Sequence, residues 1–417
     1  MEKRFADQPD THATPAGHNS QWHWHESRGL SPVINVSGTM TSLGASLVNP
    51  AVAEATAQAM GRFVRIHELQ AQASATIAAL TGAEAGCLTA SASAGITLSV
   101  AACITGLNPA HAEALPRHPG PRCEVAVQAG HLCAYGAPVS TAIELAGGVV
   151  RTVGQSTLAM DHQLRGALTQ NTAAALYVVS HHVVHYGQIP FARFVEICHE
   201  AGVPVIVDAA SEYDLHRFIA QGADLAIYSG HKFMGGPTSG IIAGRRDLVR
   251  AAYLQNIGIG RGMKIGKESI AGAIAAMEAW MVRDHAAFRA RETAALTLWK
   301  DALANLPGIT PVIVPDPTGN PLERLQVHVD PRQAGPTAAA IARHLGRLKP
   351  AIVVRDHEVE LGYFQLDPCN LAAGQAQTVA DVLTAELRKA SEIKTQPDDL
   401  DGARGGGVDA YLHWLQV

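Results

Sequence analysis

The sequence has few charged side chains, few aromatic rings and no excess of positive charge. Charged residues make up 17% and aromatic residues 5% of the 417 residues, and the formal net charge is -5. A chain with this balance lacks the positive field that a polyanion requires. We therefore expect no nucleic-acid partner.

Long apolar runs and paired cysteines are also missing. The longest uncharged apolar stretch, residues 96–107, is about twelve residues long, whereas a membrane-spanning helix needs about twenty. Residues 1–20 are polar and mixed in charge, unlike a signal peptide. The six cysteines lack CxxC spacing, which is typical of reduced thiols. We expect a cytoplasmic protein that makes no contact with membranes.

The sequence contains enough hydrophobic residues to form more than one hydrophobic core. Hydrophobic residues make up 47% of the chain, and this length exceeds the size at which a single core stops growing. We expect an N-terminal arm that begins a small lobe (1–49), a large domain (50–285) and a small C-terminal domain (286–417).

Apolar strands and helical stretches alternate through the large domain. Continuous Val/Ile/Leu strands separated by helices predict an α/β fold, with a mixed, mainly parallel sheet covered on both faces. The predicted strands are Gly86–Thr89, Glu124–Val127, Val149–Val153, Ala175–Ser180, Val203–Val207, Asp224–Tyr228 and Gly240–Ala243. After a long helical region, the C-terminal part predicts a smaller α+β lobe and a tail that is loosely held from about Pro397 to Tyr411.

Two residues at predicted strand ends have the chemistry of a pyridoxal-phosphate site. Asp208 ends one strand, and Lys232 lies in a Ser-Gly-His-Lys turn that follows the next strand. A carboxylate can keep the pyridinium nitrogen of this cofactor protonated, and a lysine can form the Schiff base. Read singly, the two could be a helix N-cap and a solvated loop lysine. The Gly-Gly-Pro that follows indicates a tightly packed turn and favours the cofactor.

The Ser91-Ala92-Ser93 segment predicts a cradle for the cofactor phosphate. It lies between a strand and a helix, so that its backbone N–H groups and hydroxyls meet at the positive end of the helix dipole. An ordinary serine N-cap is the alternative. Ser229 and His231, on either side of Gly230, are further candidates for the phosphate.

Residues that follow the neighbouring strands would enclose the pyridine ring. We expect His131 to stack on one face of the ring and the small Ala210 to lie against the other. Ser180 and His181 would contact the 3-hydroxyl group or the substrate. Three histidines, His181, His182 and His185, could instead mark zinc and a metal hydrolase. We expect no metal.

A glycine-rich loop at 258–267 carries three cations. Arg261, Lys264 and Lys267 recur at intervals of three, and glycines allow a ligand to approach closely. They would bind an anionic substrate group or the cofactor phosphate of a neighbouring subunit, unless the loop is only a solvated turn. Arg355, in the smaller lobe, is a further candidate for substrate binding.

Four motifs together resemble the selenocysteine synthase (seryl-tRNA selenium transferase) superfamily of fold-type I pyridoxal-phosphate enzymes, nearest its D-glucosaminate-6-phosphate ammonia lyase-like branch. The likeness extends from about Pro32 to Leu387. The motifs are Val33-Ile34-Asn35-Val36-Ser37-Gly38-Thr39-Met40-Thr41, Thr81-Gly82-Ala83-Glu84-Ala85, Val207-Asp208-Ala209-Ala210-Ser211-Glu212 and Ser229-Gly230-His231-Lys232.

The resemblance implies that Lys232 is the Schiff-base lysine and Asp208 the pyridinium partner. It also matches the three cations to the basic loop of the family. His231 and Gly266 stand where selenocysteine synthases have aspartate, and Cys369 replaces an arginine of the C-terminal lobe. These departures argue against selenium transfer.

The resemblance implies a lyase that acts at Cα of an amino acid or amino sugar acid and releases ammonia and a keto acid. Racemase and retro-aldolase activities share its first step and remain open alternatives. Because related sites are completed by a neighbouring subunit, we expect a homodimer or a higher homo-oligomer.

Overall fold

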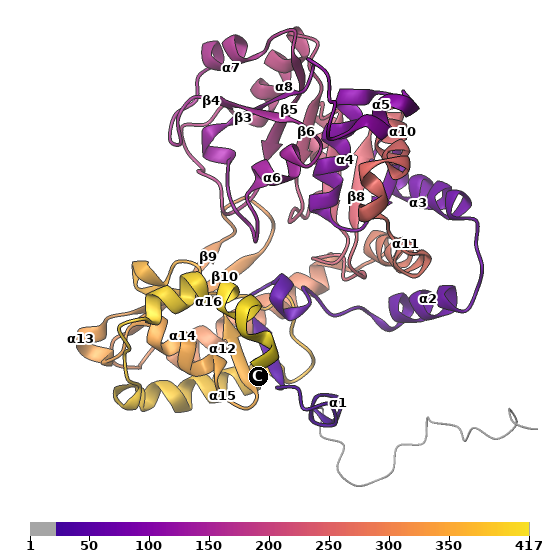
Figure 1. The fold of residues 1–417 in the computed structure, drawn as a ribbon. Coiled ribbons are helices and arrows are strands. Elements are labelled where there is room, and N and C mark those ends of the chain that lie inside the picture. The colour runs from indigo at the N-terminus through magenta and orange to yellow at the C-terminus, as the bar shows by residue number, and fades with distance from the viewer. Residues whose placement is uncertain (1–21, 417) are drawn as a thin grey trace, which may run out of the picture. The chain divides into compact units, whose positions relative to one another are not determined.

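The computed structural model describes residues 22–416, which form two compact units (Figure 1). The larger unit contains residues 38–296 and 313–324, and the smaller one contains residues 22–37, 297–312 and 325–416. The sequence placed boundaries at 49/50 and 285/286 and did not separate 313–324 from its neighbours. The first part of the expected N-terminal arm, residues 1–21, lies outside the described residues.

The larger unit is built on a seven-stranded sheet of order β2-β8-β7-β6-β5-β3-β4. Only β8 runs antiparallel to its neighbours, β2 and β7, so the expected mixed, mainly parallel sheet is confirmed. All seven predicted strands are present, and their bounds shift by up to three residues. They are β2 (Ala85–Thr89), β3 (Glu124–Gln128), β4 (Val149–Val153), β5 (Thr172–Val178), β6 (Val205–Asp208), β7 (Leu225–Ser229) and β8 (Gly240–Gly244).

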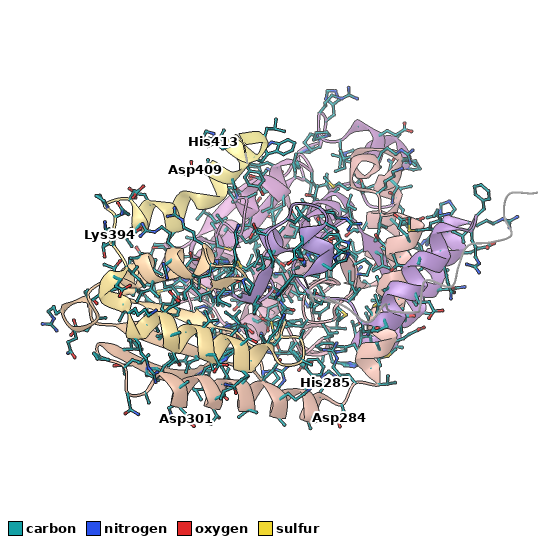
Figure 2. All side chains as sticks on the ribbon, turned by 90° about the horizontal axis from the view of Figure 1, so that it is seen from below. Asp284, His285, Asp301, Lys394, Asp409 and His413 are labelled. Atoms are coloured by element: carbon teal, nitrogen blue, oxygen red, sulfur yellow. The ribbon has the colours of Figure 1, made fainter. Side chains whose placement is uncertain are left out.

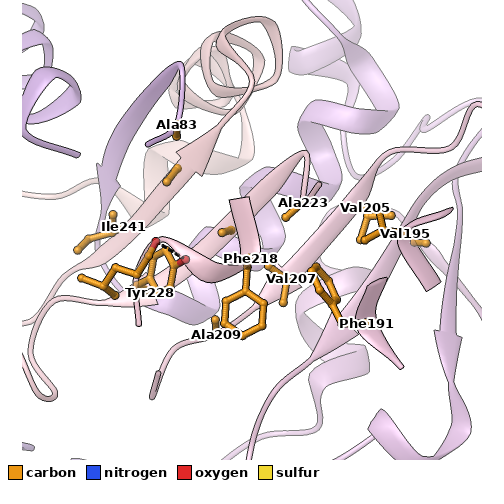
Figure 3. Close-up of a cluster of buried hydrophobic side chains, with 14 of the residues drawn as sticks. Ala83, Phe191, Val195, Val205, Val207, Ala209, Phe218, Ala223, Tyr228 and Ile241 are labelled. Atoms are coloured by element: carbon orange, nitrogen blue, oxygen red, sulfur yellow. Dashed lines mark hydrogen bonds between the residues drawn. The ribbon is translucent and has the colours of Figure 1, made fainter. Parts of the chain in front are cut away.

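Helices bury apolar side chains on both faces of this sheet. On one face, β-strand residues pack with helices α3 (Ile66–Thr81), α7 (Asp161–Ala167), α8 (Phe191–Glu200) and α11 (Lys267–Met281). Figure 3 shows part of this core, where Phe191 and Phe218 lie beside Val207. The opposite face packs with α4 (Ala92–Thr105), α6 (Val139–Glu144) and α10 (Arg246–Leu254).

Local sequence fixes where the helices around the site begin and end. Helix α3 ends at Gly82, whose φ of 72° is a left-handed conformation that glycine adopts without strain. Helix α4 begins after Ser91, whose Oγ accepts a hydrogen bond from the Ala94 N–H at 3.1 Å. The remaining helices of the larger unit are α2 (Pro50–Met60), α5 (Pro109–Ala114) and α9 (Arg217–Ala220). Helix α12 (His285–Leu303) leads out of the unit.

The smaller unit is the expected α+β lobe. The N-terminal strand β1 (Val33–Val36) pairs in parallel with β11 (Ala351–Val354), and a second sheet has the order β12-β10-β9. Strands β9 (Ile309–Pro315), β10 (Glu323–Val329) and β12 (Tyr363–Leu366) accompany helices α1 (His23–Glu26), α13 (Pro331–Ala334), α14 (Ala338–Gly346), α15 (Gln375–Arg388) and α16 (Asp399–His413).

The expectation of a loosely held tail after Pro397 was wrong, because α16 occupies it. Asp399, which is buried, forms an ion pair with Arg343 of α14 and anchors this helix. Among residues 22–416, no helix combines the length and apolar character that a membrane crossing would need.

Candidate active site

The predicted site residues of the larger unit gather along one edge of its sheet. Strands β7, β6, β5 and β3 are adjacent and parallel, so their carboxyl ends meet at this edge. Asp208 at the end of β6 pairs with Val178 of β5. The main-chain N–H of Val178 donates to His131 Nδ1, which follows β3. The edge of a sheet where parallel strands end is the usual ligand site of such folds.

Asp208 is a buried carboxyl group with little local compensation. Its side chain is 4% exposed, and its Oδ1 accepts one hydrogen bond from the Ala210 N–H at 3.2 Å. Burial raises the pKa of Asp208 to about 6, although the nearby Lys232 ammonium acts in the opposite direction. A buried carboxylate of this kind gains from a cationic N–H partner.

Lys232 follows β7, and its Nζ donates a hydrogen bond to Ser211 Oγ. The main chain on both sides of Lys232 is fixed. Ser46 Oγ donates to the His231 carbonyl at 2.6 Å, and Arg283 Nη1 donates to the Phe233 carbonyl at 3.2 Å. Ser211 lies three positions after Asp208 in the chain, so this hydrogen bond holds the lysine at the same sheet edge as Asp208.

The predicted phosphate cradle lies two strands away from Lys232. In the sheet, Gly240 of β8 pairs with both Ser229 of β7 and Thr89 of β2. A Cβ at Gly240 would lie 2.1 Å from the Ser91 carbonyl oxygen, so only glycine permits this approach. The N–H groups of Ala92 and Ser93 open helix α4, where a helix has no internal acceptors for them.

Ser229 and His231 lie on the cradle side of the lysine. Ser229 Oγ and His231 Nδ1 are 3.1 Å apart, and Ser229 is buried. Burial lowers the pKa of His231, and the adjacent Lys232 lowers it further. A neutral imidazole and a hydroxyl can both serve as hydrogen-bond donors to a phosphate.

His131 is a buried, neutral histidine. Its ring is 2% exposed, and burial lowers its pKa to about 4. Because Nδ1 accepts the Val178 N–H at 3.2 Å, the neutral ring carries its proton on Nε2. Tyr177 packs edge-on against the ring at a centroid distance of 4.4 Å. A fixed, uncharged ring at the sheet edge is suited to stacking.

The remaining predicted cofactor contacts lie on the two turns beside β5 and β6. Ser180 follows β5, and its Oγ accepts the His182 N–H at 3.2 Å. The rings of His181 and His182 are 3.9 Å apart. Ala210 is part of the turn after Asp208, and its N–H is directed at that carboxyl group.

The basic loop lies beside the cradle, but its three cations differ in their surroundings. The Ala90 N–H donates to the Met263 carbonyl at 3.3 Å, which ties the loop to the residues before Ser91. Arg261 and Lys264 are exposed. Lys267 Nζ instead donates to the carbonyl oxygens of Met60 and Arg62, at the end of α2.

Arg355 belongs to the smaller unit. Its main chain forms a bridge to Gln365, and the residue is 7% exposed.

Two residues with well-defined contacts near the site were given no role by sequence reasoning. Ser211 is the acceptor for Lys232, and Asn320 contacts the turn that carries Ser211. A serine and an asparagine have no distinctive spacing relative to Lys232. Asn320 is also 109 residues away from Ser211 in the chain.

Two buried polar groups test whether the edge fits pyridoxal phosphate. Asp208 is a buried acceptor whose charged form is poorly compensated. The Tyr135 hydroxyl is buried without a hydrogen-bond partner among the described residues, and the charge of Asp208 is among the causes that raise its pKa. A ligand that brings a protonated ring nitrogen and further polar groups would satisfy such atoms. The residues present fit this cofactor.

Comparison with known proteins identifies the family. The family model for L-seryl-tRNA selenium transferase (SelA) matches residues 33–306. The chain belongs to this family. It is 39% identical to D-glucosaminate-6-phosphate ammonia lyase of Salmonella typhimurium over 88% of this chain and 98% of that protein. It is 36% identical to 5'-C-glycyluridine monooxygenase-decarboxylase of a Streptomyces species over 85% of this chain and 90% of that protein.

Solved structures agree with this assignment. A D-glucosaminate-6-phosphate ammonia-lyase structure superposes with a TM-score of 0.79 at 38% identity, covering 88% of this chain and 98% of that one. Aspartate aminotransferase from Thermus thermophilus has a TM-score of 0.52 at 15% identity, with coverage of 88% and 92%, and indicates the shared fold alone. The expected fold-type I class is confirmed.

Proposed function

We propose that this member of the family is a pyridoxal-phosphate-dependent carbon–nitrogen lyase, which releases ammonia and a keto acid from an amino acid or amino sugar acid. The observation that carries the proposal is the meeting of Lys232, Asp208 and the Ser91 cradle at one sheet edge, in a chain 39% identical to an ammonia lyase. Pyridoxal phosphate, when bound, withdraws electrons from Cα of an amino substrate.

Lys232 and Asp208 would hold the two reactive ends of the cofactor. Lys232 would bind its aldehyde carbon covalently, and the Ser211 hydroxyl would orient the amine. Asp208 would face the ring nitrogen and keep it protonated, and the charged ring would add a directly bonded cation to the nearby Lys232 ammonium. As a neutral amine, Lys232 would also be placed to act as the base that takes the Cα proton of the substrate.

The remaining residues would fix the ring and the phosphate. His131 would stack on one face of the ring and Ala210 would lie against the other. Ser180 and His181 would contact the 3-hydroxyl group or the substrate. The N–H groups of Ala92 and Ser93, with the hydroxyls of Ser91 and Ser229 and the imidazole of His231, would bind the phosphate; these additional contacts are supported by the register of Thr89, Gly240 and Ser229.

The exposed cations of the basic loop would select the substrate. Arg261 and Lys264 can reach solvent, whereas Lys267 is engaged by the end of α2. We assign Arg261 and Lys264 to a phosphate or second carboxylate of the substrate, and keep Arg355 as a further contact. Lys267 would stabilise the loop through its hydrogen bonds to carbonyl oxygens at the end of α2.

The proposal also includes an oligomeric state and a cellular location. A homodimer or higher homo-oligomer would complete the site, as expected for enzymes of fold type I. Cysteines without CxxC spacing support the reducing cytoplasm as its location.

The test is a substrate screen with product analysis. Purified protein loaded with pyridoxal phosphate is incubated with β-hydroxy and 6-phosphorylated amino sugar acids, and ammonia and keto acid are both measured. Equal amounts of the two products support elimination. Inverted substrate without ammonia would indicate a racemase, and aldehyde release a retro-aldolase.

The Streptomyces relative requires one further measurement, because its name describes a different reaction. Oxygen uptake and carbon dioxide are therefore followed in the same reactions. Oxygen-dependent loss of carbon dioxide in place of ammonia release would overturn the lyase assignment.

A further inference from the structure

Asn320 contacts three consecutive residues of the turn that follows Asp208. Its Oδ1 accepts the Tyr213 N–H at 2.8 Å. Its Nδ2, which carries two hydrogens, lies 3.3 Å from the Ser211 carbonyl oxygen and 3.2 Å from Glu212 Oε1, and also contacts Thr318 Oγ1 at 2.9 Å and Asp316 Oδ1 at 3.3 Å within its own segment. The acceptor side meets an N–H and the donor side meets oxygens, so both ends of the amide are matched.

The segment that carries Asn320 is itself well braced. Asp316 accepts hydrogen bonds from the Thr318 N–H at 3.0 Å and the Thr318 hydroxyl at 2.6 Å. Asp316 also forms a buried ion pair with Arg324 at 2.8 Å. Residues 313–324, which include the end of β9 and the start of β10, belong to the compact larger unit. Asn320 therefore contacts the turn from a segment that the interactions of Asp316 hold in place.

The far end of the same turn is anchored independently. The Tyr213 hydroxyl lies 2.5 Å from His285 Nδ1, and Figure 2 shows His285 beside Asp284 at the start of α12. Thr318 Oγ1, whose hydrogen is directed at Asp316, also lies 2.9 Å from Glu212 Oε1. The main chain at Ser211 is thus restrained at its carbonyl by Asn320 and on its C-terminal side by Glu212 and Tyr213.

These restraints matter because Ser211 Oγ is the acceptor for Lys232 Nζ. We propose that Asn320 is a positioning residue for Lys232, acting through the main chain of Ser211. The inference rests on the proposed function, since it concerns the amine that would attach the cofactor.

The experiment measures attachment of pyridoxal phosphate to full-length apoprotein as a function of pH, by absorbance and by borohydride trapping. Wild type, Asn320→Ala, Ser211→Ala and the double variant form a cycle. In Asn320→Ala we expect the plateau rate to fall about tenfold, which corresponds to about 1.4 kcal/mol. The midpoint of the pH profile should move to lower pH, because a fixed hydroxyl acceptor favours the ammonium form of the lysine.

The double variant decides the mechanism. If Asn320 acts through Ser211, the double variant attaches the cofactor no more slowly than Ser211→Ala alone. Independent, multiplying losses would overturn the inference and leave the proposed function standing. A wild-type protein that does not attach the cofactor at Lys232 would overturn both.

Two further variants separate positioning from loss of stability. Asn108→Ala removes the N-cap of α5, which accepts the His111 N–H at 3.1 Å, and should leave the midpoint of the pH profile unchanged. Asn320→Asp keeps an acceptor for Tyr213 and removes the donors to Ser211 and Glu212, so it should reproduce the effect of Asn320→Ala. An equal midpoint shift in Asn108→Ala, or no shift in Asn320→Asp, would contradict a positioning role.

Discussion

Replacing Asp208 by asparagine should make the apoprotein more stable while it damages the site. Burial raises the pKa of this carboxyl from 3.8 to about 6, even with Lys232 nearby. A difference of about two pKa units corresponds to about 3 kcal/mol of free energy. The folded apoprotein therefore carries a cost of this order when Asp208 is ionised, and a neutral asparagine removes it.

The pH dependence of this effect has a defined sign. A carboxyl with a raised folded-state pKa binds its proton more tightly in the folded state. Its favourable contribution is present below 3.8, the ordinary pKa, and is lost as the pH rises through about 6. Asp208→Asn should therefore stabilise the apoprotein by up to about 3 kcal/mol near pH 8, and by little near pH 4.

Urea unfolding of the cofactor-free protein at both pH values measures this difference. Asp224→Asn is the matched control, because Asp224 is equally buried but paired with Arg245 at 3.0 Å and with His199 at 2.8 Å. That substitution should destabilise the protein, since it leaves its partners without their carboxylate. A loss of stability in Asp208→Asn near pH 8 would refute the reasoning.

Four other substitutions, together with Asp208→Asn in the cofactor-loaded protein, test the remaining assignments. Lys232→Ala should abolish borohydride-reducible cofactor while the circular dichroism spectrum stays unchanged. With cofactor bound, Asp208→Asn should lower kcat by about ten- to a hundredfold, the value of one buried charge-assisted hydrogen bond, and wild-type turnover would exclude the role. Arg261→Ala should raise KM for an anionic substrate with an unchanged cofactor spectrum. Weaker cofactor binding would place the loop at the phosphate of the cofactor instead. Lys267→Met should lower stability in urea without changing KM, because its ammonium binds carbonyl oxygens at the end of α2. Glu212→Gln should stabilise the protein by about 3 kcal/mol above pH 7, since burial raises the pKa of Glu212 to about 7, and no gain in unfolding free energy would contradict this.

The sheet could be predicted from the sequence because its strands are short, continuous apolar runs that are buried on both faces. Such runs, separated by helices, have few alternative arrangements. The placement of Lys232 and Asp208 at one edge could be predicted for the same reason, since strand ends in a parallel sheet meet there. The N-terminal strand β1 pairs with β11 across more than three hundred residues, a register that no local pattern specifies.

Contacts that depend on distant segments were beyond sequence reasoning. Asn320 meets the turn at Ser211 only because residues 313–324 return to the larger unit. Spacing grouped Lys267 with Arg261, yet the end of α2 supplies carbonyl acceptors that engage Lys267 alone. The tail after Pro397 has many glycines and aspartates, which predicted loose structure. Packing of Asp399 against Arg343 outweighs that local preference.

The most direct test of the central claim is borohydride reduction of the purified, cofactor-loaded protein, followed by peptide mass spectrometry. The account predicts a single pyridoxyl-modified peptide that carries the label on Lys232. A label on another lysine, or a protein that binds no pyridoxal phosphate, would contradict it.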